Sequence, residues 1–157
     1  MNRSVINVHC DGSCLNNGSS HASAGYGIVV EKDGKIIMQL FGKVRGKQTN
    51  NRAELEAILE SLKYISQCDE KEFNLYSDSL TAVNGLNGNS QRKSNRDIWQ
   101  DIEMICGTLT EKKDISIYHV DKNKLDKNDS TYYFNVLADK LAFKGANALI
   151  INKRRIS

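Results

Sequence analysis

An Asp-Gly pair between two β-rich runs is the feature that most restricts the folds open to this chain. Asp33 and Gly34 separate YGIVVEK from KIIMQLFGKV, and Asp-Gly is a preferred pair in two-residue hairpin turns. The pair therefore predicts an antiparallel hairpin over residues 26–44. An earlier β-rich run, VINVHCD at residues 5–11, predicts a strand that ends at Asp11. We therefore expect three antiparallel strands at the start of the chain.

After the hairpin, helical and β-rich patterns alternate. Five apolar residues within 51–66 recur at the spacing of one helix face and predict a helix there. The other predicted elements are a turn-forming loop at 12–25, strands at 73–78 and 115–120, and helices at 79–86, 97–109 and 132–145. Antiparallel strands followed by strands that alternate with helices indicate an α/β domain, with a mixed sheet covered by helices.

Length and composition agree with one globular domain. The chain has 157 residues, of which 39% are hydrophobic and 26% charged. No apolar run reaches the length of a membrane span, and the strand pattern begins almost at residue 1, so we expect no signal peptide and a cytoplasmic protein. Cys10, Cys14, Cys68 and Cys106 are then expected to be free thiols. His9 beside Cys10 and Cys14 leaves a metal site as a weaker alternative, because no second cysteine pair has zinc-finger spacing.

Charge alone does not identify a partner. The net charge of +3 is weak evidence for nucleic-acid binding. The basic residues gather in three clusters, which suit phosphate contacts and solvated loops equally well. The clusters are Lys43 with Arg45 and Lys47, Arg92 with Lys93 and Arg96, and Lys153 with Arg154 and Arg155.

One glutamate in the first predicted helix lies closer to the core than its neighbours. On a helical wheel Glu54 falls beside the apolar stripe, whereas Glu56 and Glu60 face solvent. A carboxylate beside the core requires a cation or a hydrogen-bond donor. The structural alternative is a first-turn acid that favours the helix dipole, with Asn50 or Asn51 as the N-cap.

Three aspartates stand at comparable places. Asp11 and Asp78 each end a β-rich strand, where α/β sheets position their chemistry. Asp139 lies in a helix that is apolar nearly all round, so we expect it to be buried and to need a partner. Structural alternatives are a helix cap for Asp78 and a turn for Asp11. Together with Glu54 these acids have no obvious cationic partner, and they would suit Mg²⁺ or Mn²⁺ if they converge in space.

Six segments, taken together, resemble the ribonuclease H family, type 1. They follow the family's order and approximate spacing across residues 5–143. The segments are CDGSCLNN, AGYGIVV, TNNRAELEAI, LYSDS, NRDIWQDI and NVLADKLA. The resemblance implies the ribonuclease H-like fold, a five-stranded mixed β-sheet flanked by α-helices, with the acids at its centre. We expect a ribonuclease H catalytic domain at residues 1–145, and the basic C-terminal tail at 146–157 lies outside the resemblance.

The resemblance further implies a set of metal ligands. Asp11 would lie between two Mg²⁺ ions, with Mn²⁺ as a possible replacement. Asp139 would hold the ion that activates water, and Glu54 and Asp78 the other. Two ions about 4 Å apart stabilise the attacking and leaving oxygens together. The reaction implied is endonucleolytic hydrolysis of the RNA strand of an RNA–DNA hybrid, which leaves 5′-phosphate and 3′-hydroxyl ends.

The substrate contacts also follow from the resemblance. A hybrid presents a wide, shallow minor groove with 2′-hydroxyls on one strand. Lys47, Thr49 and Asn95 match a pocket for a phosphate of the DNA strand, and the structural alternative for Asn95 is a helix cap. The residues that match groove contacts, through backbone or amide groups, are Gly12, Ser13, Cys14, Asn17, Asn50 and Asn51.

Three features depart from the family. The segment GLNGNSQRKSNR stands where many members have a basic handle with tryptophan, and its lack of an aromatic residue predicts weaker hybrid binding. The loop DKNKLDKNDSTY lacks the histidine that usually assists turnover. Asp129 is a candidate replacement in that loop, and His119 on the preceding strand is expected to be structural. Leu80 replaces a glutamine that often contacts a base.

These observations support an enzyme and leave two alternatives. The first hypothesis is a Mg²⁺-dependent ribonuclease H, expected to be a monomer without an obligate protein partner. A catalytically weak or inactive nucleic-acid-binding module is the first alternative, and the missing histidine is the feature most in its favour. The four acids argue against it, because an inactive module has no metal-related reason to keep them. A nuclease of the same fold that acts on another substrate is disfavoured by the TNN segment at 49–51.

Overall fold

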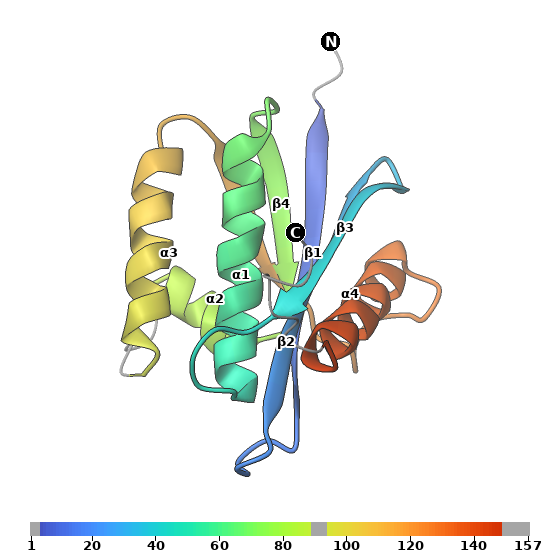
Figure 1. The fold of residues 1–157 in the computed structure, drawn as a ribbon. Coiled ribbons are helices and arrows are strands. Elements are labelled where there is room, and N and C mark those ends of the chain that lie inside the picture. Colours follow the sequence, from blue (N-terminus) through green and yellow to red (C-terminus); the bar gives the residue numbers. More distant parts are fainter. Residues whose placement is uncertain (1–3, 89–93, 149–157) are drawn as a thin grey trace, which may run out of the picture.

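The structure, a computed structural model, describes residues 4–88 and 94–148 (Figure 1). Within these residues, five strands and four helices follow one another in the predicted order. The strands are β1 (Val5–Leu15), β2 (Ser23–Lys32), β3 (Lys35–Lys43), β4 (Glu72–Ser77) and β5 (Asp114–His119). The helices are α1 (Asn50–Gln67), α2 (Leu80–Leu86), α3 (Arg96–Leu109) and α4 (Ser130–Ala146).

The strands form one mixed sheet, which confirms the predicted fold class. Their order across the sheet is β3-β2-β1-β4-β5. The pairs β1·β2 and β2·β3 are antiparallel, while β4 runs parallel to both β1 and β5. Asp33 and Gly34 form the turn between β2 and β3, with φ angles of 52° and 80°. Positive φ at both central residues is the geometry for which Asp-Gly is preferred, so the hairpin prediction is confirmed.

Helices cover the two faces of the sheet unequally. Helices α1, α2 and α3 lie on one face, and α4 alone lies on the other (Figure 1). The main core fills the first face and includes Val8, Ile58, Phe73 and Ile98, all fully buried. On the second face α4 packs mainly on β1, β2 and β3. The described part of the chain therefore has its deepest core beneath α1, the helix that carries Glu54.

The first strand is longer than its sequence predicts. β1 continues past Asp11 to Leu15, because residues 12–15 pair with residues 23–26 of β2. The parallel ladder between β1 and β4 nevertheless ends at the pair Cys10 and Ser77. Asp11 and Asp78 are the next residues on these two strands, so both follow directly where the ladder stops. The prediction that Asp11 ends a strand is wrong for β1 as a whole and holds for its pairing with β4.

Two predictions about burial are wrong. Glu56 was expected to face solvent, and it is only 1% exposed. The side of α1 that carries it is covered by Arg45 from the β3–α1 loop and by the neighbouring helix α3. Asp139 was expected to be buried, and it is exposed. Because α4 meets the sheet along only one side, its opposite side is open to solvent.

The structure also bears on the predictions about the cysteines, membrane-spanning segments and basic clusters. Cys10, Cys14, Cys68 and Cys106 are free cysteines, as expected. No helix within 4–88 and 94–148 is both long enough and apolar enough to cross a membrane. Arg92 and Lys93 of the second basic cluster, the whole third cluster and residues 149–157 of the predicted tail lie outside the described residues.

Candidate active site

Three acids converge where β1, β4 and α1 meet. Asp11 and Asp78 follow the last paired residues of two adjacent parallel strands. Helix α1 approaches β1 at Gly12, where a Cβ atom would lie 2.3 Å from the carbonyl carbon of Ala53. Only glycine permits this approach without a shift of the backbone, and it brings the first turns of α1 beside Asp11. The contact thereby sets Glu54, the next residue of α1, against both aspartates.

The acid cluster, defined here as Asp11, Glu54 and Asp78, is tight. One carboxylate oxygen from each residue lies within 4.8 Å of the others. Asp11 is 2% exposed, and its Oδ1 accepts a hydrogen bond of 2.9 Å from the backbone N–H of Gly12. Oε2 of Glu54 is buried and has no hydrogen-bond partner among the described residues. The cluster therefore offers buried oxygen atoms that its surroundings do not fully satisfy.

The close approach of the acids disfavours their ionised forms. Burial raises the pKa of Asp11 to about 10, and the charges of Glu54 and Asp78 add to the effect. Burial also raises the pKa of Glu54 to about 8, again with a contribution from Asp78, while a backbone hydrogen bond from Gly12 lowers it. A group of like charges this close cannot ionise together without added positive charge. An oxygen-only ligand set that lacks positive charge fits a hard divalent cation such as Mg²⁺ or Mn²⁺.

A lysine that the sequence reasoning missed contacts this cluster. Nζ of Lys122 lies 3.2 Å from Oδ2 of Asp78 and 3.8 Å from Oδ2 of Asp11. The expectation that the acids lack a cationic partner is therefore wrong. A signal was present in the sequence, because Lys122 follows closely after the last strand. That strand, β5, runs parallel to β4, so its carboxyl end had to lie at the same edge of the sheet as Asp78.

Asp139 lies beside the acid cluster rather than within it. It is exposed on α4 and does not share the mutual 4.8 Å separation of the other three acids. Its charge still acts on the site, because it contributes to the raised pKa values of Glu54 and Lys122. The structure thus brings three of the four predicted ligands together, with the fourth in electrostatic range.

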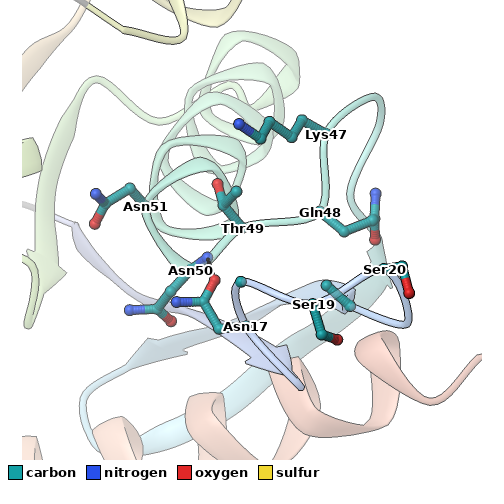
Figure 2. A pocket seen from close by; sticks show the side chains of 10 residues that line it. Asn17, Ser19, Ser20, Lys47, Gln48, Thr49, Asn50 and Asn51 are labelled. Carbon is teal, nitrogen blue, oxygen red and sulfur yellow. Dashed lines mark hydrogen bonds between the residues drawn. The ribbon is translucent and has the colours of Figure 1, made fainter.

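A cleft of about 610 Å³ lies at the start of α1, between the β1–β2 turn and the β3–α1 loop (Figure 2). Five of its lining residues were predicted from the sequence to bind substrate. These residues are Asn17, Lys47, Thr49, Asn50 and Asn51. The turn adds residues 18–20, and Figure 2 shows Ser19 and Ser20 beside Asn17. The lining is rich in amide, hydroxyl and ammonium groups, which suit a polar, anionic ligand.

The cap of α1 leaves the two asparagines available to the cleft. The N-cap is Thr49, whose hydroxyl accepts a hydrogen bond of 3.2 Å from the backbone N–H of Arg52. The alternative that placed Asn50 or Asn51 at the cap is therefore wrong. Oδ1 of Asn17 accepts a 3.1 Å hydrogen bond from the backbone N–H of Asn50, which joins the turn to the helix.

Gln48, another residue missed from the sequence, holds the opposite wall of the cleft. Its Nε2 donates to the carbonyls of Val44 and Gly46, at 2.7 and 2.9 Å. Its Oε1 accepts a 2.8 Å hydrogen bond from the backbone N–H of Ala24 in β2. The side chain of Gln48 thus stabilises the conformation of the β3–α1 loop and joins the loop to the sheet. Nothing in the sequence distinguishes this glutamine, because all its partners are backbone groups brought together by the fold.

Asn95 lies at the first residue before α3 but does not cap it with its side chain. Its backbone is left-handed, with φ 55°, and its side chain makes no capping hydrogen bond to the described residues. Oδ1 of Asn95 instead faces Nη1 of Arg52 at 3.4 Å. The same guanidinium binds both oxygens of Asp97, at 2.9 and 2.6 Å. Arg52, which the sequence reasoning also missed, therefore connects the start of α1 with the start of α3.

The remaining predicted residues occupy different settings. Asp129 is the N-cap of α4, and its carboxylate accepts a 2.8 Å hydrogen bond from the backbone N–H of Thr131. Nε2 of His119 lies 3.3 Å from the carbonyl oxygen of Asp78, beside the acid cluster. Ser13 and Cys14 are half-buried on β1, and Sγ of Cys14 lies 3.6 Å from the carbonyl oxygen of Gln48.

Comparison with known proteins gives a consistent set of matches. The family model described as RNase H matches residues 3–147. Ribonuclease H of Saccharomyces cerevisiae is 30% identical over 94% of this chain, and ribonuclease HI of Haemophilus ducreyi is 30% identical over 90% of each protein. LC11-RNase H1, solved in complex with an RNA/DNA hybrid, has a similar fold, with a TM-score of 0.70 and 20% identity over 97% of this chain and 99% of that one. The chain spans about half the length of the eukaryotic relatives that it matches, 47% in the case of S. cerevisiae.

Proposed function

The chain belongs to the RNase H family, and from this premise we propose that it hydrolyses the RNA strand of RNA–DNA hybrids with two bound divalent cations. The products would carry 5′-phosphate and 3′-hydroxyl ends. The observation that carries the proposal is the acid cluster, in which three carboxylates lie within 4.8 Å of one another. Lys122 compensates part of this charge, and the raised pKa values of Asp11 and Glu54 indicate that more positive charge is needed.

The residues of the chain would divide the work as follows. Asp11, Glu54 and Asp78 would hold the cations, with Asp139 at the rim of the site. When bound, two Mg²⁺ ions supply an activated water and stabilise the charge on the leaving oxygen. Gly12 would fix the orientation of Asp11 through its backbone N–H, which already donates to Oδ1. Because Asp11 lies on β1, Glu54 on α1 and Asp78 directly after β4, the ligands would be held on or next to rigid elements.

The cleft at the start of α1 supports a nucleic-acid substrate. Asn17, Asn50 and Asn51 offer amide groups that can both donate and accept hydrogen bonds, as recognition of 2′-hydroxyls and base edges requires. Lys47 and Thr49 supply an ammonium and a hydroxyl on the same wall, which suits a phosphate. Asn95 would act with them as part of the phosphate pocket. The fold itself can accommodate a hybrid, since LC11-RNase H1 was solved with one.

One observation favours the second candidate function, a catalytically weak or inactive binding module. Lys122 places an ammonium against Asp78 and Asp11, so part of the acid charge is compensated by the chain itself. A cluster neutralised in this way would have less need of metal. The two candidates share the cleft and differ in whether the acid cluster catalyses a reaction.

A cleavage assay separates these candidates. One 5′-labelled RNA is offered as an RNA–DNA hybrid, as an RNA duplex and as a single strand, with Mg²⁺, with Mn²⁺ and with EDTA. We expect internal cutting of the hybrid alone, abolished by EDTA. Extension of the 5′ fragments by a polymerase that needs a 3′-hydroxyl, and a phosphatase-dependent mobility shift of the 3′ fragments, would identify the ends.

The possible results bear on different parts of the proposal. Cutting of the duplex or of the single strand would reject the substrate assignment, and cutting in EDTA would reject the metal requirement. Binding of the hybrid without cutting, by a folded protein in either metal, would favour the binding module. The cytoplasmic location, the monomeric state and the domain boundary at residue 145 stay predictions.

A further inference from the structure

Lys122 contacts two of the acids that would hold the metal under the proposed function. Its Nζ contacts two acids of the cluster, at 3.2 Å from Asp78 and 3.8 Å from Asp11. A lysine side chain is an ammonium ion at neutral pH, so these contacts place a positive charge directly against the carboxylates of Asp11 and Asp78.

The backbone around Lys122 is held in place. The N–H of Val120 donates to the carbonyl of Ser77 at 2.8 Å, which attaches the loop to the end of β4. Asp121 accepts from the N–H of Asn123 at 3.0 Å through its side chain and from the N–H of Lys124 at 3.1 Å through its carbonyl. These bonds define a turn around Lys122, so its position near the acids follows from the fold of the loop.

The side chain of Lys122, unlike its backbone, has room to leave. It is 34% exposed, whereas the side chain of Asp11 is 3% exposed. Four flexible methylene groups separate the ammonium from the anchored backbone. The ammonium can therefore move from the acids to solvent without any change in the turn.

An ammonium and a divalent cation compete for the same carboxylate oxygens, because like charges a few ångströms apart repel. We propose that Lys122 is a built-in competitor for the metal site, which stabilises the acid cluster in the metal-free protein and is displaced when a divalent cation binds. The proposal rests on the proposed function, since it takes the acid cluster as the metal site. It assigns to Lys122 a role in setting metal affinity.

The direction of the effect distinguishes this role from a structural one. A lysine that merely supported the fold would, on removal, loosen the ligands and weaken metal binding. A competitor would, on removal, strengthen metal binding while lowering the stability of the metal-free protein. Half-exposed ion pairs contribute modestly, so we expect about fivefold tighter binding, equivalent to ~1 kcal/mol.

The experiment compares Lys122→Met with Lys124→Met. Lys124 lies in the same loop, its side chain is 86% exposed, and its nearest acid is Asp121 at 4.0 Å. Both variants remove one positive charge, so the net charge changes equally. Free Mn²⁺ is measured by electron paramagnetic resonance during titration of each protein, and thermal unfolding is followed in EDTA and in Mn²⁺. Lys122→Gln repeats the measurement with a polar replacement, in case Met prevents folding.

We expect tighter Mn²⁺ binding, a lower unfolding temperature in EDTA and a larger gain on adding Mn²⁺ for both Lys122 variants, with Lys124→Met like the wild type. Equal or weaker Mn²⁺ binding by folded Lys122 variants would overturn the inference while leaving the proposed function intact, provided that the wild type binds Mn²⁺. A wild type that binds no Mn²⁺ at millimolar concentration would overturn both. The same gain in Lys124→Met would reduce the effect to net charge and reject the specific role.

Discussion

Two glutamates on α1, separated by one residue, differ in how the protein compensates their charge. Glu56 is 1% exposed, and two nitrogens of the Arg45 guanidinium donate to its two carboxylate oxygens, at 2.8 and 3.2 Å. Glu54 points toward two aspartates and keeps a buried oxygen without a partner among the described residues. Burial raises the pKa of Glu54 to about 8, and the charge of Asp78 adds to it. The chain therefore supplies a cation to Glu56, and it leaves one oxygen of Glu54 without a partner among the described residues.

The difference separates acids that hold the fold from acids that serve a ligand. A buried carboxylate is tolerated when a fixed cation and hydrogen bonds replace water. Arg45 provides both to Glu56, which joins the β3–α1 loop to the helix. Among the described residues, the acid cluster receives the part-exposed ammonium of Lys122 and a backbone hydrogen bond from Gly12. Under the proposed function, this incomplete compensation would destabilise the metal-free protein and contribute to the binding energy of a divalent cation.

The strongest test of this contrast replaces an acid of the cluster. Asp78→Asn keeps the side-chain volume and removes one ligand charge. Metal catalysis supplies several kcal/mol of transition-state stabilisation, so we expect cleavage of the hybrid to fall by about 10³-fold or more. Because the charge of Asp78 repels Asp11 and Glu54, the variant should fold without loss of stability. Cleavage rates and thermal unfolding measured on the same preparation check both expectations.

The outcome can contradict the contrast in two ways. Near wild-type cleavage by a folded Asp78→Asn protein would remove Asp78 from the metal ligands. A large loss of stability would instead show that Asp78 is a structural acid like Glu56. Serine 79, the N-cap of α2, offers a nearby control: Ser79→Ala should lower stability modestly through the lost cap and leave the acid cluster unchanged.

Loss of the partner of Glu56 should have the opposite effect to Asp78→Asn, and lower stability rather than activity. Arg45→Met leaves the buried carboxylate of Glu56 without its guanidinium. Because the Arg45 side chain is itself 54% exposed and the pair is partly screened by solvent, we expect a loss of about 1–2 kcal/mol in the free energy of unfolding. Glu56→Met in the same protein should restore much of that loss, because it removes the carboxylate that lost its partner. Denaturant unfolding of the two single variants and the double variant gives the coupling energy.

Cleavage by the Arg45→Met variant, measured where it is fully folded, should keep the wild-type maximal rate. An equal loss of stability in the single and double variants would mean that Glu56 and Arg45 are not coupled. A strong loss of maximal rate with stability unchanged would place Glu56 among the functional acids and abolish the distinction from Glu54.

The pH dependence of the metal-free protein tests the unsatisfied side of the comparison. Asp11 and Glu54 have pKa values of about 10 and about 8 in the folded protein, above their ordinary values of 3.8 and 4.5. The folded state then binds more protons than the unfolded state between these limits, so stability falls as pH rises. Burial lowers the pKa of His9 to about 4, which gives the opposite slope below about pH 6.5.

The effect of Asp11 and Glu54 on stability is therefore best measured above pH 6.5, where His9 no longer opposes it. From there to pH 8 we expect the free energy of unfolding in EDTA to fall by about 4 kcal/mol, since each of the two protons retained by Asp11 and Glu54 gives ~1.4 kcal/mol per pH unit. Mn²⁺ should reverse the trend, because a bound cation favours the ionised acids. Asp78→Asn, which removes a repelling charge, should show a shallower slope. Stability that is constant or rises across this window in EDTA would mean that the acids are compensated without metal.

The elements of the fold that were predicted correctly depend on local signals in the sequence. The features that were not predicted depend on contacts between distant residues or on backbone conformation. The hairpin turn at Asp33 and the helix that contains Glu54 were predictable, because turn-forming residues and helical periodicity are visible within a short stretch of sequence. The extension of β1 to Leu15 was not, because it requires pairing with residues 23–26 of β2. Thr49, Asn50 and Asn51 are all residue types that cap helices, so the sequence does not decide which of them is the N-cap. The structure decides it, because Thr49 has the extended backbone of a cap residue, with φ −134° and ψ 158°.

The candidate site shows the same division. Asp11, Glu54 and Asp78 were found from strand ends and a helical wheel, and their convergence came only with the tertiary structure. The wheel misplaced Glu56, because it cannot detect a guanidinium that arrives from a loop. It misplaced Asp139, because an apolar composition does not reveal that only one side of α4 meets the sheet.

Asp129 provides the smallest test, as an acid held by a backbone amide rather than by a cation. It caps α4 through the N–H of Thr131 at 2.8 Å, so Asp129→Ala should lower the free energy of unfolding by about 1 kcal/mol. Asp129→Ser preserves a capping oxygen without the charge and should restore stability. If the carboxylate also assists turnover, as the sequence predicts, Asp129→Ser should still cleave the hybrid more slowly under saturating substrate. Wild-type turnover by Asp129→Ser would confine Asp129 to capping, and would place it with Glu56 among the acids that the chain itself satisfies.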